Sequence, residues 1–218
     1  MAKSLLDSNQ KSFLDFFSSQ RELYEQFYFS GGTALSEYYL QHRYSEDLDF
    51  LSEKEIDSAD LNFFLTTHKN KFNAIQIQYT QSFNRNIFFL HYGKEQELKV
   101  EFTYYPFYRL EKGMSKGNLQ IDSALDIAVN KAFILMQKAR GRDFFDLFML
   151  SQKYSFDFME LIKKARQKFD YPINYLELGK NLLKVTSFLD DPILIKEIDR
   201  AIIEDFFLDI VKKLKLLR

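Results

Sequence analysis

The chain has 218 residues, of which 46% are hydrophobic and 28% charged, a balance typical of a globular protein with a substantial core. Its 30 Lys and Arg and 31 Asp and Glu give a formal net charge of -1, which argues against a general polyanion-coating protein. The absence of Cys excludes disulfides, thiolate metal sites and cysteine nucleophiles. No signal-peptide pattern and no membrane-spanning apolar run is present, so we expect a soluble, cytoplasmic protein without a membrane partner.

The first half of the chain is predicted to mix helices with strands, from the spacing of its apolar residues. The expected helices are 4–17, 33–42 and 58–67, and the expected strands are 27–29, 47–51, 74–79, 86–92 and 97–104. Thr33 is expected to cap the second helix, because its hydroxyl can accept from a free backbone N–H. Gly93 suits a hairpin turn between the last two strands.

After about residue 120 the pattern is helical almost to the end. Residues 113–117 are predicted to form a loop, because a glycine stands at each end. Helices are expected near 122–138, 142–152, 156–168, 174–185 and 192–215. Strands mixed with helices first and helices alone afterwards predict an α+β fold, with a catalytic domain at 1–120 and a helical domain at 121–218.

Asp47 and Asp49 are the first candidate catalytic residues. Residues two apart in a strand project from the same face, so their carboxylates are expected side by side. Such a pair is costly unless a cation or proton offsets the repulsion, and Mg²⁺ prefers oxygen ligands. An Asp-x-Asp alone is weak evidence because it is common in turns, but this pair follows a strand, two glycines and a helix.

Gly31 and Gly32 have two interpretations that the sequence leaves open. They remove side chains where a phosphate would approach the backbone, and the following helix directs N–H donors toward an anion. They also suit a tight strand-to-helix turn without any ligand.

Glu101 lies in a strongly alternating strand, on the polar face with Lys99 and Thr103. A half-exposed sheet whose polar face simply meets water is an alternative explanation, because Lys99 and Thr103 share that face. If Glu101 lies beside Asp47 and Asp49, the three carboxylates form a two-metal site for phosphoryl transfer.

Three segments, taken together, match a known family. They are Gly31-Gly32-Thr33-Ala34-Leu35, then His42-Arg43-x-Ser45-x-Asp47-Leu48-Asp49, and later Lys131 with Arg142-Asp143-Phe144-Phe145-Asp146-Leu147. Between about residues 27 and 152 the chain resembles the AbiEii/AbiGii toxin-type nucleotidyltransferases of the polymerase-β-like superfamily. Beyond residue 152 the chain reads as a generic helical tail.

The resemblance implies a small palm-like mixed sheet carrying the catalytic and metal-binding residues Asp47, Asp49 and Glu101. It also implies a helical domain that clasps the nucleotide, with Mg²⁺ (or Mn²⁺) as cofactor and an NTP as co-substrate. The expected nucleotide-binding residues are Gly31, Gly32, Thr33, Arg43, Ser45, Lys131, Asp143 and Asp146. Lys138 departs from the family, which often has an arginine there, and a lysine lacks the bidentate fork.

The later residues also have ordinary structural interpretations. Lys131 suits the exposed face of an apolar helix, and Asp143 suits a helix cap. Arg142 and Asp146 are spaced to pair on a helix surface.

Other polar residues remain equally open. Arg43 can neutralise carboxylates or phosphates or anchor a loop, and Ser45 can cap the turn at Asp47. The histidines are scattered without ligand spacing and are interpreted as structural or exposed: His42, His68 and His91. The basic clusters at 163–168 and 212–218 are interpreted as solvated helix faces, and they are also where an acceptor would be sought.

The favoured function is transfer of a nucleoside monophosphate from an NTP to an acceptor hydroxyl. By resemblance the protein is a toxin that acts on RNA, tRNA in particular, and is opposed by a separate antitoxin protein. The alternatives are the same chemistry on a small hydroxylated molecule, as in aminoglycoside nucleotidyltransferases, or a non-catalytic binding module on the same fold.

Overall fold

The computed structural model describes residues 4–93, 96–187 and 193–215. The chain forms two compact units: Met1–Tyr39 with Ser45–Ser123, and Leu40–Tyr44 with Ala124–Arg218. The segment 40–44 thus belongs with the C-terminal helices, although it lies in sequence between two parts of the first unit. The assignment of catalytic and nucleotide-clasping roles to separate domains stays a prediction.

The first unit is built on a mixed sheet with the strand order β3-β4-β5-β2-β1-β7-β6 in the described residues. Its strands are β1 (Tyr28–Ser30), β2 (Leu48–Ser52), β3 (Gln76–Ser82), β4 (Arg85–His91), β5 (Glu97–Tyr104), β6 (Met114–Lys116) and β7 (Leu119–Ile121). The pairs β2–β5 and β1–β7 are parallel and the others antiparallel. With helices added, the fold class is α+β, as predicted.

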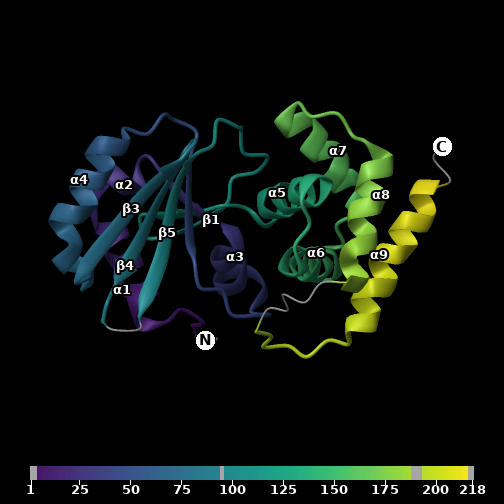
Figure 1. Cartoon of the computed structure of the whole chain (residues 1–218), viewed down its shortest axis with the longest axis horizontal. Helices are drawn as coiled ribbons and strands as arrows, with labels where there is room; N and C mark the ends of the chain where they lie inside the picture. The colour runs from purple at the N-terminus through teal and green to yellow at the C-terminus, as the bar shows by residue number, and fades with distance from the viewer. Residues whose placement is uncertain (1–3, 94–95, 188–192, 216–218) are drawn as a thin grey trace. The chain divides into compact units, whose positions relative to one another are not determined.

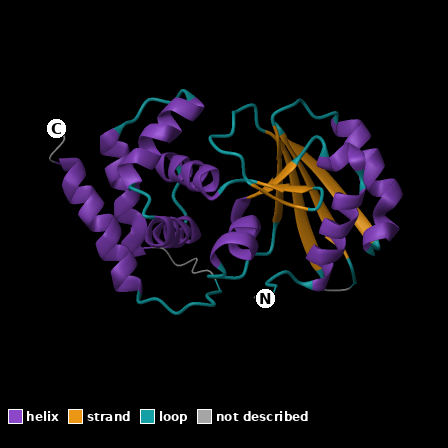
Figure 2. Ribbon diagram, turned by 180° about the vertical axis from the view of Figure 1, so that it is seen from behind, coloured by secondary structure: helices purple, strands orange, loops and turns teal. Residues whose placement is uncertain are grey.

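Three helices cover one face of this sheet: α1 (Ser8–Ser19), α2 (Arg21–Tyr24) and α4 (Ser58–His68) (Figures 1 and 2). Phe17 of α1 stacks on Phe50 of β2, with ring centroids 4.3 Å apart, and Phe50 stacks on Phe102 of β5 at 5.0 Å. Because successive strand residues point to opposite faces, Asp49 and Glu101 project from the other face of the sheet.

The chain enters a helix directly from β1. Helix α3 (Gly31–Ala34) continues as a π-helix at Leu35–Leu40, so the predicted helix exists but begins two residues earlier than expected. The expectation that Thr33 caps it is wrong: Ser30 is the N-cap residue. Thr33 instead lies inside the helix, and its hydroxyl donates to the backbone carbonyl of Asp47.

The predicted loop at 113–117 is wrong. It contains β6, and Gly117, at φ 60°, lies between β6 and β7. The hairpin escaped prediction because both strands are three residues long and β6 is exposed. β7 completes the sheet by pairing Ile121 with Phe29 of β1. The short helix α2 was also missed.

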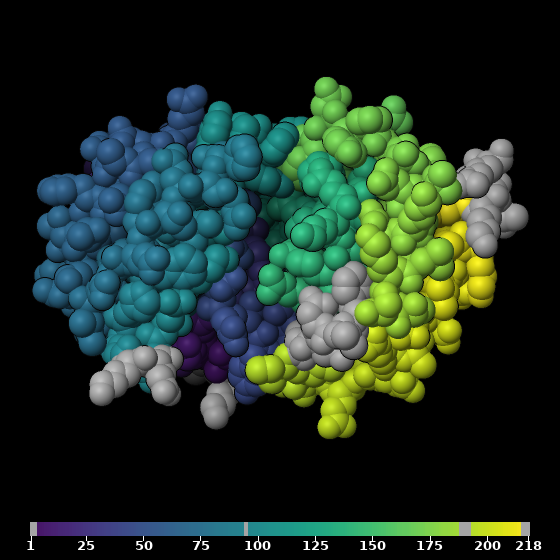
Figure 3. Space-filling view, viewed as in Figure 1, coloured from purple at the N-terminus to yellow at the C-terminus, as the bar shows by residue number. Residues whose placement is uncertain are grey.

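The second unit is helical after residue 123. Its helices are α5 (Ala124–Gln137), α6 (Gly141–Tyr154), α7 (Phe158–Phe169), α8 (Tyr175–Leu183) and α9 (Arg200–Lys215). α8 and α9 lie side by side, light green and yellow in Figure 3. The last helix was predicted from residue 192, which lies outside the described residues, but it begins at Arg200. In the described ranges no helix has the length and apolarity to cross a membrane.

Candidate active site

The parallel pairing of β2 with β5 brings the predicted acids together. Asp49 and Glu101 are register partners on these strands, and Asp47 lies immediately before β2. The Lys99 ammonium lies 3.0 Å from Asp47 Oδ2 and 3.6 Å from Glu101 Oε2. The carboxylates of Asp47 and Glu101 therefore share one cation, which places all three acids at the same part of one sheet face.

Gly31 packs directly against this site. Its φ is 75°, and a Cβ built on it would lie 2.2 Å from Asp49 Oδ2. Two features therefore require a glycine at this position: the positive backbone angle and the close approach of the Asp49 carboxylate. Gly32 follows in the first turn of α3.

The loop before Asp47 is fixed by two contacts to neighbouring helices. The Thr33 hydroxyl of α3 donates to the Asp47 carbonyl, and the Gln10 amide of α1 donates to the carbonyls of Ser45 and Glu46 at 2.9 and 3.0 Å. Ser45 thus contacts Gln10 through its backbone carbonyl. These bonds hold the entry to β2 in place on both sides.

Glu101 is 8% exposed and does not simply meet water, in contrast to the alternative interpretation. Arg85 of β4 donates to both its oxygens, Nε to Oε1 at 2.6 Å and Nη2 to Oε2 at 2.5 Å, and the Thr103 hydroxyl donates at 2.9 Å. Burial alone would raise the pKa of Glu101, but Arg85, with Thr103 and Lys99, outweighs it and lowers that pKa. The carboxylate is therefore ionised and held by cations.

Arg85 was missed by sequence reasoning. It stands opposite Thr103 in the β4–β5 register, diagonal to Glu101. No motif contains it, and only the pairing of β4 with β5 reveals its position.

The donor chemistry of the site suits a hard divalent cation. As placed, no three His, Asp or Glu side chains in the described ranges are arranged to hold a metal ion. Asp47 and Glu101 nevertheless already hold one cation, the ammonium of Lys99. Carboxylate oxygens are the ligands that Mg²⁺ prefers, so Asp47, Asp49 and Glu101 fit this ion once their side chains converge.

A second cluster of charges is buried inside the second unit. The Lys131 ammonium lies 2.8 Å from Asp143 Oδ1 and 2.7 Å from Asp146 Oδ2. Arg43 forms a bidentate pair with Asp146, at 2.6 and 2.8 Å. Lys131 is therefore not an exposed-face lysine, because it is only 6% exposed. Arg142 and Asp146 do not form the expected surface pair, because Asp146 is 0% exposed whereas Arg142 is exposed.

Two further residues complete this cluster. His42 donates from Nε2 to Asp146 Oδ1 at 2.7 Å and stacks on Phe145, and it is fully buried. Arg140 donates to Asp143 Oδ2 at 2.7 Å, whereas Lys138, the position of the expected family arginine, is exposed. Arg140 was missed, although its spacing of three residues from Asp143 is a usable signal.

The cations of this cluster keep its acids ionised. Burial would raise the pKa values of Asp143 and Asp146. The charge of Lys131 opposes burial most strongly for both, so the pKa of Asp143 is lowered and that of Asp146 lies well below its usual range. For His42, burial lowers the pKa, and the opposing hydrogen bond and charge of Asp146 do not restore it.

The sequence suggested that the basic cluster at 163–168 is a solvated helix face, but this is only partly correct. Lys168 is 4% exposed, and its ammonium lies 2.8 Å from Asp126 Oδ1. In the later cluster, residues 216–218 lie outside the described residues.

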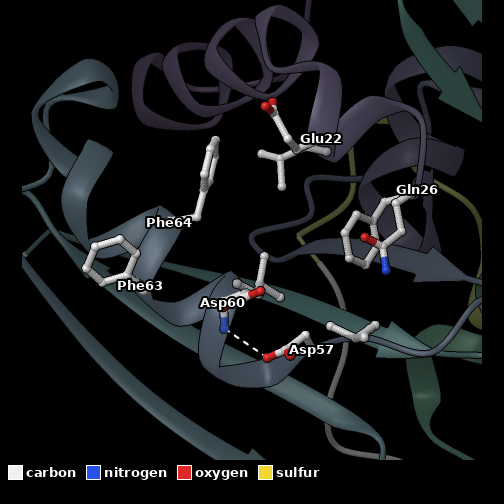
Figure 4. A pocket seen from close by; sticks show the side chains of 10 residues that line it. Glu22, Gln26, Asp57, Asp60, Phe63 and Phe64 are labelled. Carbon is white, nitrogen blue, oxygen red and sulfur yellow. Dashed lines mark hydrogen bonds between the residues drawn. The ribbon is translucent and has the colours of Figure 1, made fainter.

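A cavity of about 400 Å³ lies on the helix-covered side of the sheet (Figure 4). Its wall is mainly apolar, and Phe63 and Phe64 of α4 line it together with Leu23 and Phe27. Phe27 packs on Phe102, on the face opposite the acids. The cavity is therefore separate from the acid site.

The family of the chain follows from comparison with known sequences. The profile described as "Nucleotidyl transferase AbiEii toxin, Type IV TA system" matches residues 14–214. The chain belongs to the AbiEii nucleotidyltransferase toxin family. This agrees with the resemblance drawn from its motifs, and extends it beyond residue 152.

Individual proteins are similar to this chain in sequence or in fold. The uncharacterised protein aq_aa25 of Aquifex aeolicus (strain VF5) is 35% identical to this AbiEii-family chain over 147 residues. The aligned part covers 66% of this chain and 66% of that protein, which is just under two thirds of each. JHP933 from Helicobacter pylori shares the fold with a TM-score of 0.60 at 20% identity, covering 96% of this chain and 93% of that one. An H. pylori candidate nucleotidyltransferase gives 0.62 at 21% identity, covering 96% of both.

Proposed function

We propose that this AbiEii-family chain transfers a nucleoside monophosphate from an NTP to an acceptor hydroxyl of RNA, tRNA in particular, and releases pyrophosphate. The observation that carries the proposal is the placement of Asp47, Asp49 and Glu101 on one sheet face beside Gly31. The type IV toxin–antitoxin description of the family supports a toxin that a separate antitoxin opposes.

In this proposal Asp47, Asp49 and Glu101 hold Mg²⁺ or Mn²⁺. When bound, the ion activates the acceptor hydroxyl and offsets the charge of the phosphates. Thr33 orients the backbone of Asp47 through its hydroxyl, which keeps the first carboxylate in position. Gly31 and Gly32 add no side chain of their own at the start of α3, where the proposal places an anionic phosphate beside the metal-binding carboxylates.

The buried cluster of the second unit is the proposed phosphate-binding part. Lys131, Arg43 and Arg140 supply three positive charges, and Asp143 and Asp146 supply two negative charges. Lysine and arginine side chains are the groups that bind phosphate in proteins, and their gathering here supports the proposal. The rival interpretation is a purely structural ion-pair network, and the nucleotide-binding role of these residues stays a prediction.

The test is incubation of the purified protein with each labelled NTP, Mg²⁺ and total tRNA, beside an Asp49→Asn variant. Label in RNA with the natural protein alone is the expected result. Asp49→Asn should stay folded, because it removes one charge from a repelling group.

Two other outcomes discriminate between the alternatives. Metal-dependent NTP binding without RNA labelling would indicate a small hydroxylated acceptor, which the near-neutral net charge of -1 favours. Absence of both NTP binding and transfer would contradict catalysis and leave a binding module.

A further inference from the structure

The acid site contains its own cations. Arg85 contacts both oxygens of Glu101, while Lys99 lies between Glu101 and Asp47. The hydrogen bond to Glu101 raises the pKa of Arg85, and the charges of Asp49 and Asp47 add to this effect. Two positive charges of the protein thus face three carboxylates.

These contacts use the atoms that a divalent ion needs. A carboxylate that accepts a bidentate guanidinium has its lone pairs largely engaged, and such charge-assisted pairs are among the strong hydrogen bonds. An ion that takes Glu101 and Asp47 as ligands therefore has to displace Arg85 and Lys99.

The displaced guanidinium has room to move. The Arg85 side chain is 46% exposed, whereas that of Glu101 is 10% exposed, so the arginine reaches a nearly buried acid from the solvent side. Its departure requires no change in the core. A guanidinium that leaves a carboxylate is well suited to a phosphate, because its donor fork matches either group.

We propose that Arg85 and Lys99 are counter-cations within the protein that compete with the divalent ion for Glu101 and Asp47. When the ion displaces Arg85, the guanidinium binds the phosphates of the NTP. The inference rests on the proposed function and deepens it. It makes ion and nucleotide binding reciprocal: each partner binds weakly alone and more tightly when the other is present.

The experiment measures Mn²⁺ binding by electron paramagnetic resonance, with and without non-hydrolysable NTP analogues. Without nucleotide, Arg85→Gln should bind Mn²⁺ about five- to tenfold more tightly than the natural protein, as expected for removing one competing charge-assisted pair. It should also lose most of the gain in Mn²⁺ affinity that the analogue produces. Lys99→Gln should likewise tighten binding of Mn²⁺ alone.

The matched control is Arg21→Gln, which removes another Arg–Glu pair, at 2.8 Å on α2, from the helix-covered side of the sheet. It should leave Mn²⁺ affinity unchanged, and thermal melting should show that all variants are folded. Unchanged or weaker Mn²⁺ binding by Arg85→Gln, or an undiminished gain with the analogue, would overturn the inference.

The two levels of the proposal fail differently. If the natural protein binds Mn²⁺ in a manner that Asp49→Asn abolishes, but Arg85→Gln behaves like the natural protein, only the counter-cation inference fails. If the natural protein and Asp49→Asn bind no Mn²⁺ with any nucleotide, the proposed function fails with it.

Discussion

Gly31 shows how a single residue connects the turn to the acid site. Its positive φ favours glycine at the backbone, and a steric requirement adds to this because an added Cβ would lie 2.2 Å from Asp49 Oδ2. The sequence left open whether the two glycines serve a tight turn or a ligand. The structure shows the turn, with one of its glycines pressed against a proposed metal-binding carboxylate.

Gly31→Ala is predicted to reduce nucleotidyl transfer by about 100-fold, because displacing a catalytic group by about 1 Å has an effect of that size. Gly117→Ala is the control: Gly117 has φ 60°, but an added Cβ would meet nothing within 4 Å. It should cost only the backbone strain, on the order of 1 kcal/mol. Transfer assays and thermal melts of both variants separate the two effects, and equal activity losses would contradict the steric argument.

At the scale of elements, α5 and α7 are joined by a buried ion pair. Lys168 and Asp126 have side chains that are 1% and 0% exposed. Removing one partner of such a pair leaves an uncompensated buried charge, whereas replacing both with apolar residues is often tolerated. The pair therefore makes the contact between these helices sensitive to single substitutions.

Lys168→Met is predicted to destabilise the helical unit by about 3–5 kcal/mol. The double variant Lys168→Met/Asp126→Leu should recover most of that loss. Lys163→Met removes an exposed pair with Glu160 and should leave the free energy of unfolding nearly unchanged. Urea denaturation followed by circular dichroism measures all three, and a mild effect of the first variant alone would refute the prediction.

At the scale of the whole molecule, the buried groups of the second unit predict how stability depends on pH. His42 has a lowered pKa in the folded state, so below its unfolded pKa of about 6.5 the unfolded chain binds a proton that the folded chain does not. Stability should therefore fall as the pH drops below this value. Asp143 and Asp146 act in the same direction below about pH 4, because their folded pKa values are also lowered.

The melting temperature should accordingly decrease from pH 7.5 to 5.5, and His42→Gln should flatten this decrease. One group contributes at most about 1.4 kcal/mol per pH unit. Glutamine keeps a donor for Asp146, so the variant removes the titration and retains a hydrogen bond. If His42→Gln shows the same slope as the natural protein, His42 is not the group responsible.

The sequence by itself determined the features that depend on near neighbours in the chain. Alternation placed Glu101 on the polar face of β5 and put Asp49 on the face opposite to Leu48 and Phe50 of β2. Helical spacing located α5 to α8 closely, because their apolar faces repeat within each helix. The very short elements β6, β7 and α2 contain too few residues to show a period.

Only the tertiary structure decided which distant residues meet. Lys99 and Asp47 are 52 positions apart and Arg43 and Asp146 are 103 apart, so strand order and helix packing had to be known before either pair was visible. The local sequence pattern did not reveal burial either. A lysine is normally expected at the surface because its charge is stabilised by water, but Lys131 is buried between two carboxylates that balance its charge. The sequence thus determined the acids of the site, and the fold determined the cations that face them.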